Sequence, residues 1–258
     1  MIVTASGARL GVLSRRALFF HPTGIGVAMT IWYDPTYSDS IASAVQAVCD
    51  LKSHPAVLLW LVANEPNYEA TGTSTADAVA AISDVVAAVQ AADPSRPCSV
   101  VWGGVPSAAV LSQLAHVDLW GLNVYRGASF GTLFDEWAAL SAKPMWLSEY
   151  GADSYSAAAA AENQTAHARE VGALAAEIAA HASAAGGVCA GGAIFAWADE
   201  WWKLSSGSPS VQETTSTWTQ TGYFDEQMHE VRRPPPDRTY IARAGARPAQ
   251  RASARVRL

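Results

Sequence analysis

Two glutamates stand at the ends of apolar stretches of the sequence. Glu65 follows apolar residues in LLWLVANEPN, residues 58–67, and Glu149 lies in KPMWLSEYGAD, residues 143–153. A carboxylate at the end of a buried strand costs free energy unless it has a partner or a function. Glycosidic cleavage uses two carboxyl groups: one protonates the departing oxygen, and the other attacks or stabilises the developing oxocarbenium centre. Glu65 and Glu149 are therefore the candidate catalytic pair.

Polar and aromatic side chains near the ends of other apolar stretches fit the same chemistry. An indole ring offers an apolar plane to the C–H face of a sugar ring. Asn and Tyr side chains hydrogen-bond to hydroxyl groups and tune the ionisation of carboxylates. We therefore predict substrate-binding roles for Asn64, Tyr125, Trp197, Trp32 and Asn123.

The elements that must position these residues alternate between strand and helix. Short apolar runs predict six strands, and segments with helical periodicity predict five helices between them. The strands are expected over 24–32, 56–64, 98–104, 117–125, 144–150 and 191–199. The helices are expected within 38–55, 74–94, 106–115, 130–142 and 156–187.

This alternation predicts an α/β fold with a parallel sheet. Two layouts fit, an open doubly wound sheet and a closed (β/α)8 TIM barrel. The first strand is not followed by a glycine-rich phosphate loop, which disfavours the nucleotide-binding version of the open sheet. In a barrel the carboxyl ends of all strands ring one pocket, so the candidate residues would converge there.

Composition narrows the possible partners. The chain has 258 residues, 50% of them hydrophobic, and a net charge of -6. Residues 232–258 hold eight Arg and one Asp, whereas the rest carries 9 Lys and Arg against 22 Asp and Glu. An acidic body does not suit a nucleic-acid partner, and no apolar run is long enough to span a membrane. We predict a catalytic domain over 1–231 and a disordered basic Pro- and Arg-rich tail over 232–258.

The cysteines indicate neither a disulfide framework nor a metal site. Cys49, Cys98 and Cys189 are isolated in the sequence and lack zinc-ligand spacing. We predict no cofactor, and we expect Cys49 and Cys98 to be buried thiols. His54 is interpreted as a structural hydrogen-bonding residue before the 56–64 strand. The sequence does not decide the cellular compartment of the protein: there is no clear signal peptide, and one sequon at Asn163 gives weak support for secretion.

Three of these stretches resemble motifs of one enzyme group. HPAVLLWLVANEPN is similar to the strand-four motif of the clan A glycoside hydrolases, which are retaining β-glycosidases on (β/α)8 barrels. KPMWLSEYGAD resembles their strand-seven nucleophile motif, and GGAIFAWADEWWK resembles the strand-eight tryptophan segment of the family 2 type barrel. The resemblance covers roughly residues 24–203.

The resemblance implies a role for individual residues. It implies Glu65 as general acid/base, Glu149 as nucleophile and Asn64 as a contact of the sugar 2-hydroxyl. Tyr125 would lie near the nucleophile, and Trp197 would form the floor of the sugar subsite. Retention of configuration needs carboxyl groups about 5 to 5.5 Å apart, whereas about 6.5 to 9.5 Å indicates inversion.

The N-terminal region departs from the family pattern. If the strand before Glu65 is the fourth, the 24–32 strand is the third, and only 23 residues precede it. Two βα units need roughly 60 residues or more. We therefore expect an incomplete barrel, truncated at the N-terminus and lacking its first one or two βα units, with MIVTA as a remnant strand. The arginine that the family places on its second strand has no counterpart in a matching motif.

Three functions compete at this point. The first is a retaining O-glycosyl hydrolase that cleaves β-linkages in a glucan or related oligosaccharide. The second is a β-glucanosyltransferase, in which a sugar acceptor replaces water at the same covalent intermediate. The third is a non-catalytic carbohydrate-binding remnant, which the missing strands favour and the two retained glutamates oppose. A β-linked oligo- or polysaccharide is the expected partner in all three.

Overall fold

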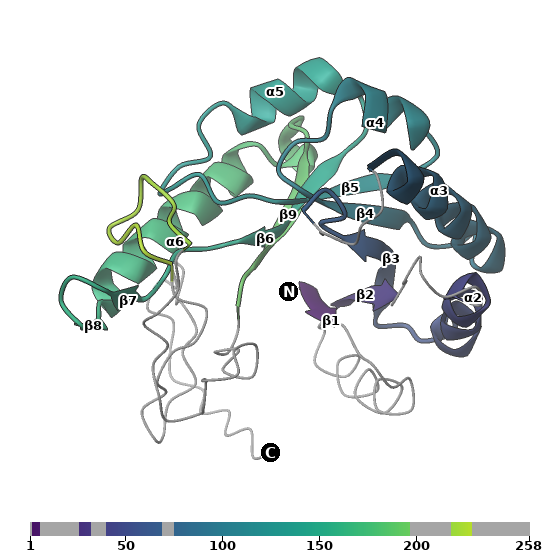
Figure 1. Cartoon of the computed structure of the whole chain (residues 1–258), viewed down its shortest axis with the longest axis horizontal. Coiled ribbons are helices and arrows are strands. Elements are labelled where there is room, and N and C mark those ends of the chain that lie inside the picture. Colours follow the sequence, from purple (N-terminus) through teal and green to yellow (C-terminus); the bar gives the residue numbers. More distant parts are fainter. Residues whose placement is uncertain (1, 6–25, 32–39, 69–74, 197–217, 229–258) are drawn as a thin grey trace, which may run out of the picture. The chain divides into compact units, whose positions relative to one another are not determined.

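The computed structural model of the chain describes residues 2–5, 26–31, 40–68, 75–196 and 218–228 (Figure 1). These residues belong to two compact units. The first comprises Met1–Arg126, Phe130–Tyr150 and Glu177–Phe195, and the second comprises the remainder. The predicted domain limits of 1–231 and 232–258 remain predictions, because residues 229–258 lie outside the described ranges.

The first unit is built on a parallel sheet, which has seven strands among the described residues. Their order is β1 (Ile2–Ala5), β2 (Gly26–Ile31), β3 (Val57–Asn64), β4 (Cys98–Gly103), β5 (Leu119–Asn123), β6 (Met145–Tyr150) and β9 (Cys189–Ile194). Cα atoms of β1 and β9, the two edge strands, come within 8 Å of each other. The sheet is therefore curled on itself, which confirms an incomplete (β/α)8 barrel. It also confirms the expected strand within MIVTA.

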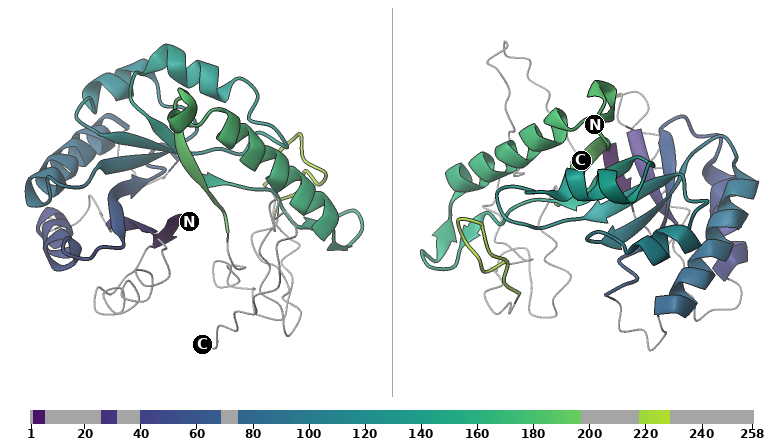
Figure 2. Two further views of the ribbon diagram at one scale, coloured as in Figure 1. Left: turned by 180° about the vertical axis from the view of Figure 1, so that it is seen from behind. Right: turned by 90° about the horizontal axis from the view of Figure 1, so that it is seen from above.

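Four helices of this unit connect successive strands. They are α2 (Ser40–Leu51), α3 (Thr75–Ala92), α4 (Ala108–Gln113) and α5 (Leu133–Leu140), and they lie on the outer side of the sheet (Figures 1 and 2). Each falls within a predicted helical segment. Ser107 Oγ caps α4 by accepting a hydrogen bond from Val110 N at 3.3 Å, which satisfies one of the amides left unpaired at a helix start.

The two faces of the sheet bury different sets of side chains. On the outer face Trp120 packs against Trp137 of α5, with ring centroids 6.3 Å apart. The inner face carries one continuous apolar cluster, to which six strands contribute: Ala28, Leu59, Leu61, Val101, Leu119 and Trp146, with Ala193 packed against it. Side chains from β2 and β9 share this cluster because the sheet curves around it.

The predicted helix over 156–187 is wrong at both ends. The structure has a short hairpin of β7 (Tyr155–Ser156) and β8 (Ala161–Glu162) before α6 (Gln164–Ala180), and a 3-10 turn η2 (Ser183–Ala185) after it. Asn163 begins the helix, because its Oδ1 accepts from Ala166 N at 3.0 Å. Upstream, the Asp225 carboxylate accepts from Ala157 N. A side-chain cap and a tertiary hydrogen bond thus override the helix propensity of the alanine run.

The expectation for the cysteines is confirmed in part. Cys98 is buried, as is Cys189, but Cys49 is exposed. The buried residues Ala44, Val48 and Leu51 mark the inward stripe of α2. Cys49 lies one position beyond Val48 and is therefore turned to solvent. Within the described ranges, the structure contains no helix with the length and apolar character needed to cross a membrane.

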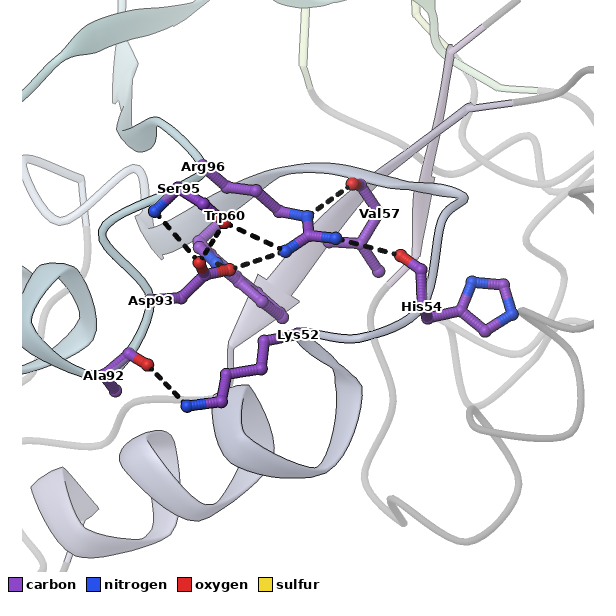
Figure 3. A network of polar contacts seen from close by, with 8 residues as sticks. All are labelled: Lys52, His54, Val57, Trp60, Ala92, Asp93, Ser95 and Arg96. Carbon is purple, nitrogen blue, oxygen red and sulfur yellow. Dashed lines mark hydrogen bonds and ion pairs between the residues drawn. The ribbon is translucent and has the colours of Figure 1, made fainter.

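A polar network ties together the amino-terminal ends of β3 and β4 (Figure 3). Asp93 is only 3% exposed and accepts from Trp60 Nε1 at 3.0 Å and from Arg96 at 2.9 Å. Arg96 also donates to the carbonyl oxygens of Val57 and His54, at 2.8 and 3.2 Å. His54 Nδ1 accepts from Ala56 N at 3.1 Å, which confirms its interpretation as a structural residue.

The network holds the pKa of Asp93 low. Burial alone would raise this pKa, but hydrogen bonds from Ser95, Arg96 and Trp60 outweigh burial and lower it from 3.8 to about 2. A lowered folded-state pKa means that the carboxylate stabilises the fold above pH 4. This stabilisation is lost as the pH falls from about 4 to about 2.

We expect Asp93→Asn to lower the free energy of unfolding by about 2 kcal/mol at pH 7, because the neutral amide loses the charge that pairs with Arg96 and keeps only one of the two acceptor oxygens. Urea unfolding at pH 7 and at pH 3 measures this loss, which should shrink at the lower pH. The control is Asp84→Asn, on the exposed side of α3, which should change stability by less than about 0.5 kcal/mol. An equal loss in the two variants would contradict the assignment.

Candidate active site

The carboxyl ends of β3, β5 and β6 carry four of the residues predicted from the sequence. Asn64 is the last residue of β3, Asn123 is the last of β5, and Glu149 is the next to last of β6. The ladder pairs Gly103 with Asn123, and Asn123 with Glu149. Glu65 follows β3 directly. Because the strands are parallel, all four residues lie along the carboxyl edge of the sheet, where its strands end.

The backbone around Glu65 is strained. Ala63 and Glu65 have φ angles of 64° and 48°, in the left-handed region, which costs a residue with a Cβ roughly 1–2 kcal/mol. The ladder to β4 shifts between Val62 and Asn64, and Glu65 N donates to Val101 O at 3.0 Å. The chain therefore turns sharply at the residue that the sequence singles out. Such strain is typical of functional sites.

A chain of side-chain hydrogen bonds joins three strands at this edge. Ser148 Oγ donates to Asn123 Oδ1 at 2.7 Å, and Asn123 Nδ2 donates to Asn64 Oδ1 at 3.2 Å. Ser148 and Asn123 are buried, whereas Asn64 is exposed. Since its oxygen is used by Asn123, Asn64 presents its NH2 group outward. No acceptor for this NH2 group is found among the residues that the structure describes.

The chain of hydrogen bonds needs a glycine beside it. A Cβ on Gly121 would lie 2.9 Å from Ser148 Oγ, 3.0 Å from Val101 Cγ2 and 3.1 Å from Trp146 Nε1. Trp146 Nε1 in turn donates to Ser99 Oγ at 3.2 Å. A larger residue at position 121 would therefore crowd the side chains of Ser148 and Trp146 and disturb their hydrogen bonds.

Glu149 has a hydrogen-bond donor from the segment that follows the neighbouring strand β5. Tyr125 OH donates to Glu149 Oε2 at 3.1 Å, and Val124 N donates to Glu149 O at 3.0 Å. A donor aimed at a half-buried carboxylate favours its ionised form. Arg126, the next residue, forms a two-pronged ion pair with Glu136 of α5 at 3.0 and 2.8 Å, so its guanidinium is held by that helix.

The structure brings some predicted residues together and leaves others untested. Hydrogen bonds or strand register link Asn64, Asn123, Tyr125 and Glu149, and Glu65 follows Asn64. Trp32 and Trp197 lie outside the described residues. Sequence reasoning missed Ser148, Asn67 and Tyr68. Their only signal was position, directly before or shortly after a candidate glutamate.

Metal ligation finds no support in the described part of the chain. There, His, Cys, Asp and Glu side chains form no group of three or more that could hold a metal ion. What the edge does offer is a carboxylate with a phenol donor, a second carboxylate on a strained turn, and an outward amide. These groups can donate protons, accept protons and attack an electrophilic carbon.

Comparisons with known proteins agree with the fold. A model of the family "Glycosyl hydrolases family 2, TIM barrel domain" matches residues 27–171. The β-glucuronidase of Pongo abelii is 32% identical over 117 residues, which cover 40% of this chain and 17% of that protein. The chain thus spans less than a fifth of the length of this relative.

Two solved structures show the likeness of fold. The β-glucuronidase of Bifidobacterium dentium, complexed with coumarin-3-O-glucuronide, has a TM-score of 0.58 at 17% identity, covering 77% of this chain and 35% of that one. A β-galacturonidase of Eisenbergiella tayi bound to galacturonate has a TM-score of 0.51 at 14% identity, covering 78% of this chain and 39% of that one.

The hydrogen bond between Ser148 and Asn123 yields a stability prediction. We expect Ser148→Ala to lower the free energy of unfolding by about 1–2 kcal/mol, because it leaves the buried Asn123 oxygen without its donor. A double-mutant cycle with Asn123→Ala, measured by urea unfolding, should give a coupling energy of about 1 kcal/mol. A coupling energy near zero would show that the two side chains act independently.

Proposed function

Because the chain belongs to the family 2 glycosyl hydrolases through their TIM-barrel domain, we propose that it carries the active site of a retaining β-glycosidase. The observation that supports this best is the contact of Tyr125 OH with Glu149 Oε2, at the sheet edge that also bears Glu65. A carboxylate that accepts a hydrogen bond from a phenol suits a nucleophile, because that contact favours the charged form. The carboxyl group of Glu65, on a strained turn beside the exposed amide of Asn64, suits the residue that donates the proton.

The first step forms a covalent intermediate. Glu149 attacks the anomeric carbon, the glycosidic bond breaks, and Glu65 gives its proton to the departing oxygen. The leaving group departs as an alcohol, and the sugar stays bound to Glu149 as an ester. In the second step Glu65 takes a proton from water, the resulting hydroxide oxygen attacks the anomeric carbon, and Glu149 is released. Two inversions give net retention of configuration.

The other predicted residues would hold the sugar. The outward NH2 of Asn64 would donate to a hydroxyl next to the anomeric carbon, with Asn123 fixing its orientation. Hydrogen bonds of this type strengthen in the transition state. Trp32 and Trp197 would supply apolar planes for the ring. Tyr125 would keep Glu149 ionised between turnovers.

The substrate is best sought among neutral β-hexosides and acidic β-hexuronides. A β-linked glucan suits an apolar platform with neutral hydrogen-bond donors. The matched relatives are named β-glucuronidase and β-galacturonidase, which adds uronides to the candidates. A panel of p-nitrophenyl β-glucoside, β-galactoside, β-glucuronide and β-galacturonide covers these classes. Proton NMR of the first product should show the β-anomer for a retaining enzyme.

Glu149→Gln should remove turnover of the best panel glycoside by a factor on the order of 10⁴ or more, because an amide cannot form the glycosyl ester. Glu65→Gln should lower kcat/KM roughly 10²- to 10⁴-fold for a disaccharide, whose leaving group needs a proton, and less for a p-nitrophenyl glycoside. Initial-rate kinetics on both substrates measures the contrast. Unchanged turnover in Glu149→Gln would refute the assignment of the nucleophile.

Tyr125→Phe should shift the acidic limb of the kcat/KM profile to higher pH, because the ionised Glu149 loses its donor. The rate at the optimum should fall roughly tenfold. A pH–rate profile from pH 4 to 9 measures the shift. Tyr155→Phe, a tyrosine on the β7 strand, is the control and should leave the profile unchanged. An unshifted acidic limb in Tyr125→Phe would count against the role given to this contact.

A further inference from the structure

The turn after Glu65 presents an aromatic ring to solvent. Tyr68 is 68% exposed, the highest value among the exposed large hydrophobic residues that the structure describes. Its backbone N–H donates to Glu65 O at 2.9 Å, so it closes the turn that begins at Glu65. Exposing a large aromatic surface to water is unfavourable. Tyr68 therefore offers an uncovered ring face at the turn that begins with the proposed acid.

The turn is fastened to the neighbouring strand on both sides. Asn67 Nδ2 donates to Gly103 O at 3.0 Å, and Asn67 Oδ1 accepts from Gly103 N at 3.0 Å. The side-chain amide thereby pairs with the last residue of β4 as a neighbouring strand would. Two hydrogen bonds hold the turn in place, so the backbone that carries Tyr68 is fixed before any ligand arrives.

The ring of Tyr68 lies over the inner face of the sheet. A Cβ on Gly103 would lie 2.6 and 2.8 Å from Cδ2 and Cζ of this ring, so the ring edge occupies the space of the missing side chain. Gly103 follows Ser99 and Val101 by steps of two along β4. Val101 belongs to the inner apolar cluster, and side chains alternate along a strand. The ring therefore caps β4 on the face that bears the candidate site.

Gly103, over which the ring lies, belongs to the same row of paired residues as the candidate site. Gly103 pairs with Asn123, which pairs with Glu149, while Glu65 starts the turn that carries Tyr68. The ring is thus placed between the strand that bears the proposed acid and the strand that bears Asn123. The proposed acid protonates the leaving-group oxygen, so a surface on its own turn faces the leaving group.

We propose that Tyr68 is a specificity-determining residue, whose ring stacks on the six-membered ring of the leaving group, either a pyranose or an aryl group. This inference rests on the proposed function. The leaving-group subsite is then formed by the Glu65–Tyr68 turn. Asn67 and Gly103 are the residues that position Tyr68 there. Leaving groups that bury the ring face gain apolar contact there, whereas small leaving groups gain nothing.

The test compares leaving groups on one sugar. For Tyr68→Ala, kcat/KM for the p-nitrophenyl glycoside should fall on the order of tenfold, whereas that for the β-glycosyl fluoride of the same sugar should stay unchanged, since fluoride carries no ring. Tyr68→Phe keeps the ring and should retain activity on both. Gly103→Ala should reproduce the selective loss with Tyr68 present, because its Cβ displaces the ring. Leu140→Ala, an exposed residue of α5, is the control for both substrates.

The outcomes separate this inference from the proposed function. Equal loss on both substrates, or no loss on either, in a Tyr68→Ala protein with unchanged thermal unfolding would overturn it. If wild type turns over no glycoside, the proposed function fails, and binding then decides the role of Tyr68. Saturation-transfer NMR with phenyl 1-thio-β-D-glucuronide and phenyl 1-thio-β-D-glucoside should show contact to the phenyl protons in wild type and its loss in Tyr68→Ala. Absence of that contact in wild type would also overturn the inference.

Discussion

The parallel pairing of β3 to β6 is the constraint on which the candidate site depends. It sets Gly103, Asn123 and Glu149 in one row across three strands. Two side-chain hydrogen bonds, from Ser148 to Asn123 and from Asn123 to Asn64, connect this row to β3. Residues separated by 85 positions in the chain, Asn64 and Glu149, thus belong to one edge. A slip of one residue in any ladder would turn these side chains to the helices.

The two ends of the sheet divide stability and chemistry between them. At the amino ends, Asp93 and Arg96 satisfy each other and the neighbouring carbonyl groups, which stabilises the loops before β3 and β4. At the carboxyl ends, Ala63 and Glu65 are strained and Tyr68 is exposed. This is the division expected of a barrel, whose active site lies at the carboxyl face.

The sequence predicted the parts of the fold that depend on local pattern. Five of the six strands and the four outer helices lie where apolar periodicity placed them, whereas the last strand, expected over 191–199, is β9 (Cys189–Ile194). Asn64, Asn123 and Glu149 stand at strand ends as expected. The Ala-rich helix was wrong because Asn163 and Asp225 act through contacts that periodicity does not contain. The strained φ of Glu65, the hydrogen bond of Ser148 to Asn123 and the position of Tyr68 over Gly103 depend on neighbouring strands. Position near a candidate glutamate was therefore the only signal in the sequence for Ser148 and Tyr68. The roles of Trp32 and Trp197 stay predictions.

The proposed mechanism requires that Glu149 form a covalent bond to the sugar. The most direct measurement is mass spectrometry of the full chain after incubation with a 2-deoxy-2-fluoro-β-glycosyl fluoride of the sugar that it cleaves, followed by peptide mapping. The fluorine at the 2-position slows release of the intermediate, so the sugar should be found on Glu149, in the peptide that contains MWLSEYG. A sugar on another residue, or none on a protein that hydrolyses the matching glycoside, would contradict the account.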